Sequence, residues 1–214
     1  MRRLDRLTMG IATALALFSW TARVSWAQEQ VVNGGFETPL VTLHNDADFT
    51  SIPGWTLCGG SFIEVQNHCC GDPFEGNQHV ELDSTASSAM CQTIPTVPGQ
   101  QYRLSFAYSP RPGVPDNRIN VMWDGQMLTQ LNANGSSLSN TDWKVFRFSV
   151  TASGPSTVLE FADAGVSNTV GGFIDDVSLL PPAPAPTVGS GGLGIVALAL
   201  LGIGFARLQR SATR

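Results

Sequence analysis

The chain has 214 residues and a formal net charge of −5, but the charge is unevenly distributed. Between Gln28 and Thr187, five basic residues stand against 16 acidic ones, which gives this segment a net charge of −11. Because nucleic-acid binding requires a positive surface, this balance argues against a nucleic-acid partner. An acidic surface suits a domain that binds a neutral ligand or a cation.

The first 27 residues have the pattern of a signal peptide. Three arginines precede a short apolar core, Met9–Trp20, and small residues occupy the −3 and −1 positions before a cleavage site after Ala27. An uncleaved membrane anchor would need a longer apolar core. We therefore predict export of one domain, residues 28–180, which is long enough to bury its own core.

This domain is predicted to be β-structure almost throughout. Apolar and polar residues alternate from Gln101 to Ser109, and Ile119, Val121 and Trp123 repeat the period of two, which is typical of strands with one buried face. The predicted strands, bounded by turn residues, are Ser61–Gln66, Gln78–Asp83, Ala89–Ile94, Gln101–Ser109, Arg118–Asp124, Trp143–Thr151, Thr157–Ala162 and Gly172–Leu180. Their number and length favour an all-β, two-sheet antiparallel sandwich, specifically a jelly roll.

The C-terminal residues are predicted to hold the domain at a membrane. Residues 181–187 form a Pro-rich spacer, which prolines stiffen, and residues 188–206 contain no charge. That stretch approaches the roughly 20 residues that span a bilayer. The basic tail, residues 207–214, places the C-terminus in the cytoplasm by the positive-inside rule. We expect one transmembrane helix and a domain that faces the periplasm or cell surface.

Four cysteines lie in the predicted exported domain: Cys58, Cys69, Cys70 and Cys91. Disulfides persist outside the cytoplasm, so we predict two of them. Adjacent cysteines are poorly placed to bridge each other, which leaves 58–69 with 70–91, or 58–70 with 69–91. The alternative is a metal site that includes His68 and His79, although the paired-cysteine knuckle usual for zinc is missing.

No common catalytic motif is present: the sequence lacks G-x-S-x-G, H-E-x-x-H and G-x-x-x-x-G-K-[ST]. Glu64, Glu75, Glu81 and Asp83 could supply the two carboxylates of a glycosidase. Such carboxylates are more often solvated surface groups or metal ligands. We therefore predict that the protein is not an enzyme and keep polysaccharide hydrolysis as an alternative.

Three acidic residues are candidates for binding calcium. Asp175 and Asp176 lie side by side in an apolar strand, so one of them must face inward or an edge, where burial without a partner is costly. A cation would compensate that charge, and oxygen ligands favour calcium over zinc. Glu37, near the start of the domain, is the third candidate. A turn acid with a solvent-facing pair is the other interpretation.

Several short motifs occur in a characteristic order: Asn33-Gly34-Gly35-Phe36-Glu37, Ile52-Pro53-Gly54-Trp55, Glu75-Gly76, His79-Val80-Glu81-Leu82 and Ile174-Asp175-Asp176-Val177. In this order they resemble the galactose-binding-like jelly-roll domains of plant cell-wall proteins and bacterial exported proteins. The resemblance covers about Val31 to Leu180. It implies a jelly roll that binds cell-wall or matrix polysaccharide without catalysis, with a structural calcium at Glu37, Asp175 and Asp176.

The C-terminal segment resembles bacterial tripartite sorting tails, which combine a Pro-rich motif, a membrane helix and a basic end. Pro184-Ala185-Pro186 departs from the Pro-Glu-Pro (PEP-CTERM) type, and Gly191-Gly192 is similar to a GlyGly-CTERM type that a rhomboid-like protease normally cuts. The resemblance implies a sorting protease as a partner and release of the domain after C-terminal processing. It also implies a Gram-negative producer of exopolysaccharide.

The leading functional prediction is a surface- or matrix-associated carbohydrate-binding protein, and the alternative is a structural or adhesive protein that binds another protein. We place the glycan site in the Pro-rich loop Ser109–Arg118. Arg111, Asp116 and Asn117 would supply polar contacts, and Phe74 would supply a stacking face. Prolines limit the entropy that such a loop loses on binding.

Two alternatives remain for the position of the glycan site. The first is the sheet face that bears His79, Glu81 and Arg103. The second concerns the tryptophans: Trp55 and Trp123 could stack on a sugar, or they could fill the core.

Overall fold

Every regular element in residues 28–182, the part of the chain described by the computed structural model, is a β-strand. The predicted signal peptide, most of the spacer, the predicted transmembrane helix and the basic tail lie outside these residues. Within residues 28–182, no helix is long and apolar enough to cross a membrane.

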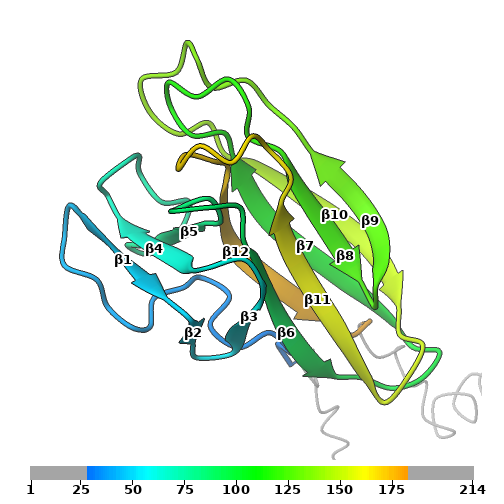
Figure 1. The fold of residues 1–214 in the computed structure, drawn as a ribbon. Coiled ribbons are helices and arrows are strands. Elements are labelled where there is room, and N and C mark those ends of the chain that lie inside the picture. The colour runs from blue at the N-terminus through cyan, green and yellow to red at the C-terminus, as the bar shows by residue number, and fades with distance from the viewer. Residues whose placement is uncertain (1–27, 183–214) are drawn as a thin grey trace, which may run out of the picture.

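Twelve strands form two six-stranded antiparallel sheets that pack face to face (Figure 1). Sheet A has the order β1-β4-β5-β12-β7-β10, and sheet B has the order β2-β3-β6-β11-β8-β9. The strands are β1 (Asn45–Phe49), β2 (Ser51–Ile52), β3 (Trp55–Gly59), β4 (Ile63–Asn67), β5 (His79–Glu81), β6 (Ala89–Pro95), β7 (Gln101–Ser109), β8 (Ile119–Trp123), β9 (Gln126–Leu131), β10 (Lys144–Thr151), β11 (Ser156–Asp163) and β12 (Phe173–Leu180).

The strand order is that of a jelly roll. Strands β5 to β12 give the order 5-12-7-10 in sheet A and 6-11-8-9 in sheet B. The chain therefore crosses between the sheets at nearly every connection, as two interlocked Greek keys require. Strands β4 and β1 extend sheet A beyond β5, and β3 and β2 extend sheet B beyond β6. The predicted all-β, two-sheet antiparallel sandwich is confirmed.

Aromatic side chains fill the space between the sheets. The ring of Trp55 lies 5.6 Å from that of Phe36 and 6.0 Å from that of Phe161, which in turn meets Phe106 edge-on at 5.1 Å. The indole N–H of Trp55 donates to the Asn33 carbonyl at 3.1 Å. Trp55 is thus a fully buried core residue whose polar atom is satisfied.

Trp123 also belongs to the core. It is 8% exposed, and its indole N–H donates to the carbonyl of Thr151 at 2.9 Å. The alternation that placed it with Ile119 and Val121 therefore reports a buried face, and neither tryptophan is available to stack on a sugar.

The N-terminal segment is bound to the last strand. Glu29 accepts a hydrogen bond from the Leu179 amide at 2.7 Å, the Gln30 amide donates to the Leu179 carbonyl at 3.1 Å, and the Val177 amide donates to the Gly34 carbonyl at 2.9 Å. A Cβ at Gly34 would collide with the Val177 carbonyl oxygen, so this close approach requires glycine. The Asn33-Gly34-Gly35 motif is therefore a packing element that joins the two ends of the domain.

One disulfide joins Cys58 of β3 to Cys91 of β6. The presence of a disulfide is confirmed, but the domain has one bridge where two were predicted, and both predicted pairings are wrong. Strands β3 and β6 are neighbours in sheet B, with Thr56 opposite Cys91, so the bridge links adjacent strands that are 33 residues apart in sequence. Cys69 and Cys70 instead carry free thiols in the loop between β4 and β5.

Candidate functional site

The outer face of sheet A carries polar side chains that are buried although they point away from the core. Glu64 and Gln66 of β4 lie opposite Glu81 and His79 of β5, whereas the alternating neighbours pack into the sandwich. Gln66, His79 and Glu81 have no exposed surface, and Glu64 is 8% exposed. An outer sheet face is normally solvated, so loops must fold back over this part of the sheet.

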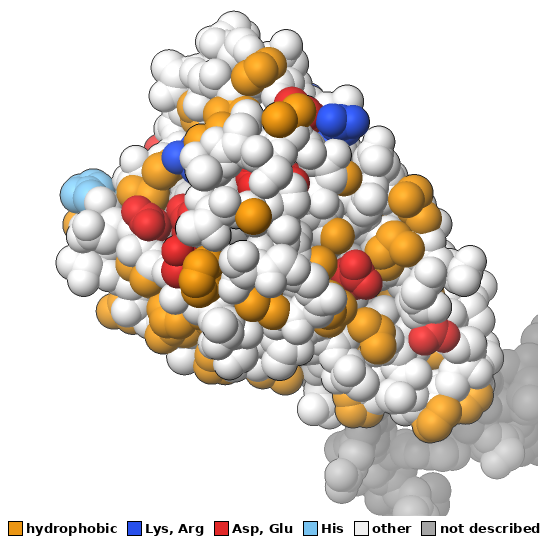
Figure 2. Space-filling view, viewed as in Figure 1, with side chains coloured by type: hydrophobic (Ala, Val, Ile, Leu, Met, Phe, Trp, Pro, Cys, Tyr) orange, Lys and Arg blue, Asp and Glu red, His pale blue; other side chains and the backbone are white. Residues whose placement is uncertain are grey.

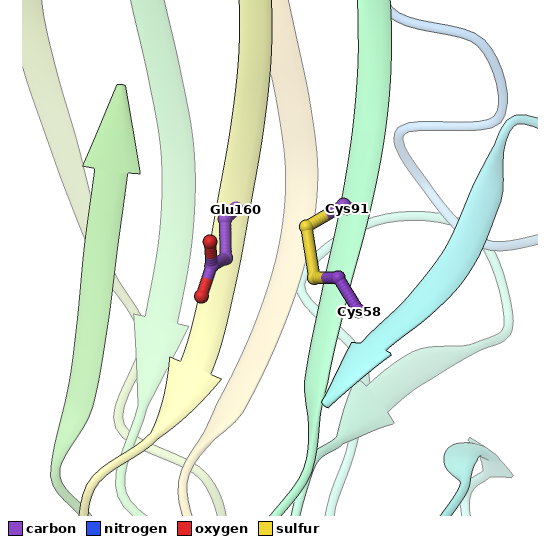
Figure 3. A group of neighbouring side chains, drawn as sticks. All are labelled: Cys58, Cys91 and Glu160. Atoms are coloured by element: carbon purple, nitrogen blue, oxygen red, sulfur yellow. A yellow bond between two sulfur atoms is a disulfide. The ribbon is translucent and has the colours of Figure 1, made fainter. Parts of the chain in front are cut away.

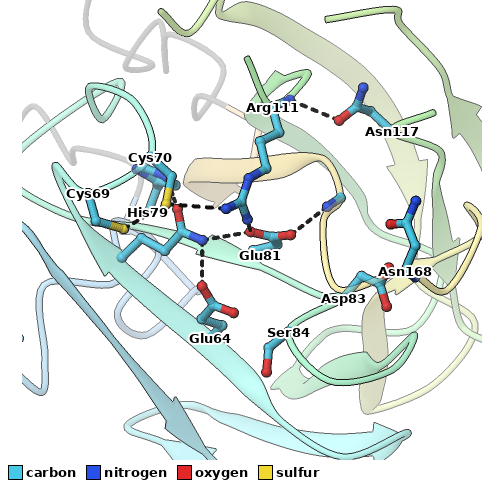
Figure 4. A network of polar contacts seen from close by, with 12 residues as sticks. Glu64, Cys69, Cys70, His79, Glu81, Asp83, Ser84, Arg111, Asn117 and Asn168 are labelled. Carbon is cyan, nitrogen blue, oxygen red and sulfur yellow. Dashed lines mark hydrogen bonds and ion pairs between the residues drawn. The ribbon is translucent and has the colours of Figure 1, made fainter. Parts of the chain in front are cut away.

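Arg111 comes from one of these loops, the connection between β7 and β8, and organises the polar face (Figure 4). Its guanidinium forms an ion pair with Glu81. The other Glu81 oxygen accepts a hydrogen bond from the Gly171 amide. The side-chain amide of Gln66 donates to both Glu64 and Glu81, at 2.6 Å each. Four side chains and one backbone amide thus form one connected network.

The protonation state of Glu81 depends on its burial and on the groups that contact it. Burial raises the pKa of Glu81, and the positive charge of Arg111 opposes that rise. All three groups that contact the Glu81 oxygens are donors, so they stabilise the ionised carboxylate. Burial also raises the pKa of Glu64. Arg111 is held further by the ring of Phe173, 5.9 Å from the guanidinium carbon.

His79 is a neutral packing group. Burial lowers its pKa to about 3. Its ring lies 4.4 Å from Phe173 and 5.7 Å from Trp143, and Nε2 lies 3.2 Å from the Gln66 side-chain oxygen. Nδ1 has no hydrogen-bond partner among residues 28–182. Nδ1 of His68 lies 3.0 Å from the Asn67 side-chain oxygen, and among residues 28–182 neither histidine belongs to a group of three potential metal ligands within 4.8 Å of one another.

The two thiols lie at the edge of this network. The Cys69 and Cys70 sulfurs are 3.0 Å apart, and Arg111 donates to the Cys70 sulfur at 3.4 Å. The hydrogen bond from Cys69 and the charge of Arg111 lower the pKa of Cys70 from 9.0 to about 7, whereas the same hydrogen bond raises the pKa of Cys69. The pair should therefore contain one acidic thiol and one inert thiol.

We expect alkylation of native protein with iodoacetamide to label Cys70 first, with a rate that rises through a midpoint near pH 7, because the thiolate is the nucleophile. Mass spectrometry of peptides quenched at each pH measures the labelling. The Cys69→Ala variant lacks the donor thiol and should move the midpoint upward. A midpoint at or above 9.0, the ordinary value, in the native protein would contradict this assignment.

Two partly exposed aromatic rings border the polar network. Phe74, in the loop between β4 and β5, is 39% exposed and meets Trp143 edge-on at 6.1 Å. The indole N–H of Trp143 donates to the Asp72 carbonyl at 2.8 Å. Asp175 of β12 accepts hydrogen bonds from the backbone amides of Phe74 and Glu75. The rings are therefore held in place by backbone contacts, and we call Phe74 and Trp143 the aromatic rim.

The predicted ligand-binding residues are divided between different places. Arg111 enters the polar network and Phe74 lies on the aromatic rim. Asn117 is buried inside the loop, where its side-chain oxygen accepts from the Arg111 amide at 2.9 Å. Asp116 forms a separate ion pair with Arg118 at 2.8 Å. The structure thus brings Arg111 and Phe74 to one surface, while Asn117 shapes the loop and Asp116 lies apart.

Trp143 and Gln66 are the members of the site that the sequence analysis missed as site residues. Trp143 was assigned only as the first residue of a strand, and Gln66 only as the last. The available signal for Gln66 was its place beside Glu64 on the polar face of an alternating strand, which does not distinguish a covered side chain from a solvated one. For Trp143 it was a large aromatic residue between Asp142 and Lys144, outside any apolar pattern.

The predicted calcium ligands mainly hold a loop. Glu37 accepts hydrogen bonds from the backbone amides of Asn77 and Gln78 at 2.6 and 2.9 Å. Asp175 accepts a hydrogen bond from the backbone amide of Phe74, earlier in the same loop. Burial raises the pKa of Asp175 to about 8. Asp176 is half-buried at a bulge in β12. Calcium at Glu37, Asp175 and Asp176 stays a prediction.

A different trio has the closest set of potential metal ligands. Within residues 28–182, the one group of three such atoms within 4.8 Å of one another belongs to Cys58, Cys91 and Glu160 (Figure 3). Both sulfurs of this group are joined in the disulfide, so they are not available as thiolate ligands.

The fold and the site thus define a disulfide-containing jelly-roll domain with a loop-covered polar face. The chain belongs to the family described as protein of unknown function (DUF642), whose model matches residues 29–180. No curated protein matches the sequence.

Solved structures with a similar backbone are distant in sequence. TmCBM61 in complex with β-1,4-galactotriose is 18% identical, with a TM-score of 0.45 over 72% of this chain and 99% of that one. The adhesin domain of Lys-gingipain is 13% identical, with a TM-score of 0.47 over 71% and 96%. The Podospora anserina GH26-CBM35 β-(1,4)-mannanase is 16% identical, with a TM-score of 0.42 over 67% of this chain. The chain covers only 28% of the mannanase's length.

Proposed function

We propose that residues 28–182 form a non-catalytic carbohydrate-binding domain whose glycan site is the aromatic rim beside the Arg111 network. The observation that carries this proposal is the combination of two partly exposed aromatic rings with the partly exposed guanidinium of Arg111, which the buried network holds in place on the same surface. Sugars are bound by aromatic faces that stack on the ring and by polar groups that reach its hydroxyls. Neither ring needs to be ordered on binding, because backbone contacts already hold the rim.

The carboxylates of this surface support binding better than hydrolysis. A glycosidase requires one protonated and one ionised carboxyl group on either side of the scissile bond. Glu81 has no exposed surface and is paired with Arg111, and Glu64 shares the Gln66 amide with it. Neither group can flank a sugar ring without dismantling the network.

We also propose that the domain acts outside the cytoplasm, as the signal-like and membrane-like segments of the sequence suggest. The Cys58–Cys91 disulfide supports this location, because disulfides form and persist in oxidising compartments. The face shown in Figure 2 carries more acidic than basic groups, in keeping with the net charge of the domain. The negative net charge of residues 28–182 favours neutral glycans at the aromatic rim over anionic partners.

Glycan binding through the rim predicts a loss of affinity in Trp143→Ala. We expect the dissociation constant for a neutral glycan, first identified on an array, to rise about fivefold or more, since truncated aromatic anchors cost more than about 1 kcal/mol. Calorimetry measures the affinity, and circular dichroism checks the fold. Met127→Ala is the matched control, because Met127 is 58% exposed on sheet B, away from the rim.

Unchanged affinity in folded Trp143→Ala and Phe74→Ala variants would remove the rim as the site. If wild-type protein binds no glycan on the array, the alternative of an adhesive protein that binds another protein takes its place.

A further inference from the structure

A second concave surface lies on sheet A, at the opposite end of β7 from Arg111. It is a groove of about 430 Å³ where the end of β12 meets β7 and β10. Arg103 lies opposite Ser149, and Ser105 lies opposite Arg147, so the four side chains share the outer face of the sheet. With about 3.4 Å per residue along a strand, Arg103 is about 20 Å from the end of β7 at which the Arg111 loop begins.

The groove contains the basic side chains of the domain that form no ion pair. Residues 28–182 contain five basic side chains, and three of them form ion pairs: Arg111 with Glu81, Arg118 with Asp116, and Lys144 with Asp142. Within that part of the chain, Arg103 and Arg147 form no ion pair and no side-chain hydrogen bond, although acidic residues outnumber basic ones about three to one. Both unpaired arginines line the groove.

The two arginines are close enough to act together. They are diagonal neighbours on adjacent strands, a relation that separates residues by about 7 to 8 Å. Asp176 is near enough to feel the charge of Arg147 without forming an ion pair with it, and Glu29 is bound to Ser178 and Leu179. Two adjacent like charges without a counterion repel each other, so an anion between them would be stabilised.

We propose that this groove binds a carboxylated sugar, such as a uronic-acid unit of an anionic polysaccharide. A guanidinium fork matches a carboxylate in a bidentate arrangement. The hydroxyls of Ser105 and Ser149 offer donors and acceptors to ring hydroxyls, and Leu180 provides apolar lining. A bare phosphate or sulfate would use only the arginines. The volume falls within the usual range for small-ligand sites, about 300 to 1,000 Å³.

This inference rests on the proposed carbohydrate-binding function but on different residues, so the two can be tested separately. The full chain is titrated with a uronic-acid oligosaccharide and with its carboxyl-reduced, neutral counterpart. We expect wild-type protein to bind the acidic oligosaccharide about tenfold or more tightly than the neutral one. The Arg103→Gln/Arg147→Gln variant should lose this preference while its binding to the neutral oligosaccharide is unchanged.

The matched control is Arg118→Gln/Lys144→Gln, which removes the same charge from exposed positions outside the groove and should keep the preference. The proposal is overturned by equal affinity of wild-type protein for both oligosaccharides. It is also overturned if the control loses the preference to the same extent, because the preference would then come from the net charge of the whole protein and not from the groove. Displacement of the acidic oligosaccharide by sodium sulfate at equal concentration would show a bare-anion site instead.

A parallel titration of Trp143→Ala separates the two proposals. Retained acid preference together with unchanged neutral binding would contradict the aromatic rim and support the groove. If Trp143→Ala loses binding to the neutral oligosaccharide and wild-type protein shows no preference for the acidic one, the aromatic rim is supported and the groove is contradicted.

Discussion

Replacing Arg111 with methionine is expected to lower the free energy of unfolding by about 3 to 5 kcal/mol, because removal of one partner leaves a buried charge uncompensated. Glu81 has no exposed surface, and its remaining contacts, Gln66 and the Gly171 amide, are neutral donors. Urea denaturation at pH 8 measures the loss. The Arg111→Met/Glu81→Gln double variant should recover much of it, since no charge then remains buried at this position.

The same variant should be sensitive to pH in a defined direction. Burial raises the pKa of Glu81, so without Arg111 the folded protein retains a proton that the unfolded chain releases. A carboxyl group of this kind contributes stability that is present below its unfolded pKa, about 4.5, and is lost as the pH rises through its folded pKa. The difference between Arg111→Met and wild type should therefore shrink from pH 8 to pH 5.

The control for both measurements is Arg118→Met, which breaks a solvent-accessible ion pair and should leave the free energy of unfolding nearly unchanged. If Arg111→Met is no more destabilising than this control, or equally destabilising at both pH values, the network is not held together by the buried charge pair.

Removing the disulfide is the second change with a large expected effect. The Cys58→Ser/Cys91→Ser variant should lose about 4 kcal/mol, the chain-entropy value for a link across 33 residues. Reduction of wild-type protein should give a similar loss in urea denaturation. Cys69→Ser/Cys70→Ser is the matched control: it also replaces two sulfurs but opens no cross-link, so its cost should be smaller. Equal losses in the two double variants would contradict a single structural bridge at 58–91.

The fold was predictable for most strands with one face buried by the opposite sheet, although β3, Trp55–Gly59, was missed. The alternation from Gln101 to Ser109 coincides with β7, and the pattern around Val121 lies within β8. Strand β1, Asn45–Phe49, was not predicted because it is an edge strand of mostly polar residues with little buried surface. Period-two patterning requires a buried face, and a solvated edge does not produce one.

The site was predictable only in part, because its burial comes from loops. Arg111 and Phe74 were identified from a stiff polar loop and an aromatic residue between polar neighbours. Gln66 could not be assigned, since nothing in its local pattern shows that a loop from another part of the chain covers it. Asn117 was identified as a ligand residue because it is polar and in a loop, yet its side chain supplies bonds within that loop.

The cysteine pairing failed for a related reason. Excluding a bridge between adjacent cysteines was compatible with the free thiols of Cys69 and Cys70. Nothing in the sequence pattern indicates, however, that β3 and β6 are neighbours in the sheet. Pairing across a sheet is a property of topology, and spacing along the chain does not determine it.

The hydrogen bonds that join Glu29 and Gln30 to Leu179 affect how the domain can be connected to other proteins. The chain enters and leaves the sandwich at positions joined by direct hydrogen bonds. A domain with adjacent ends can be placed as a cassette within a surface loop of a carrier protein, because the loop need not stretch to accommodate it. The polar network and the aromatic rim lie at the other end of sheet A, so such an insertion would leave that surface facing away from the carrier.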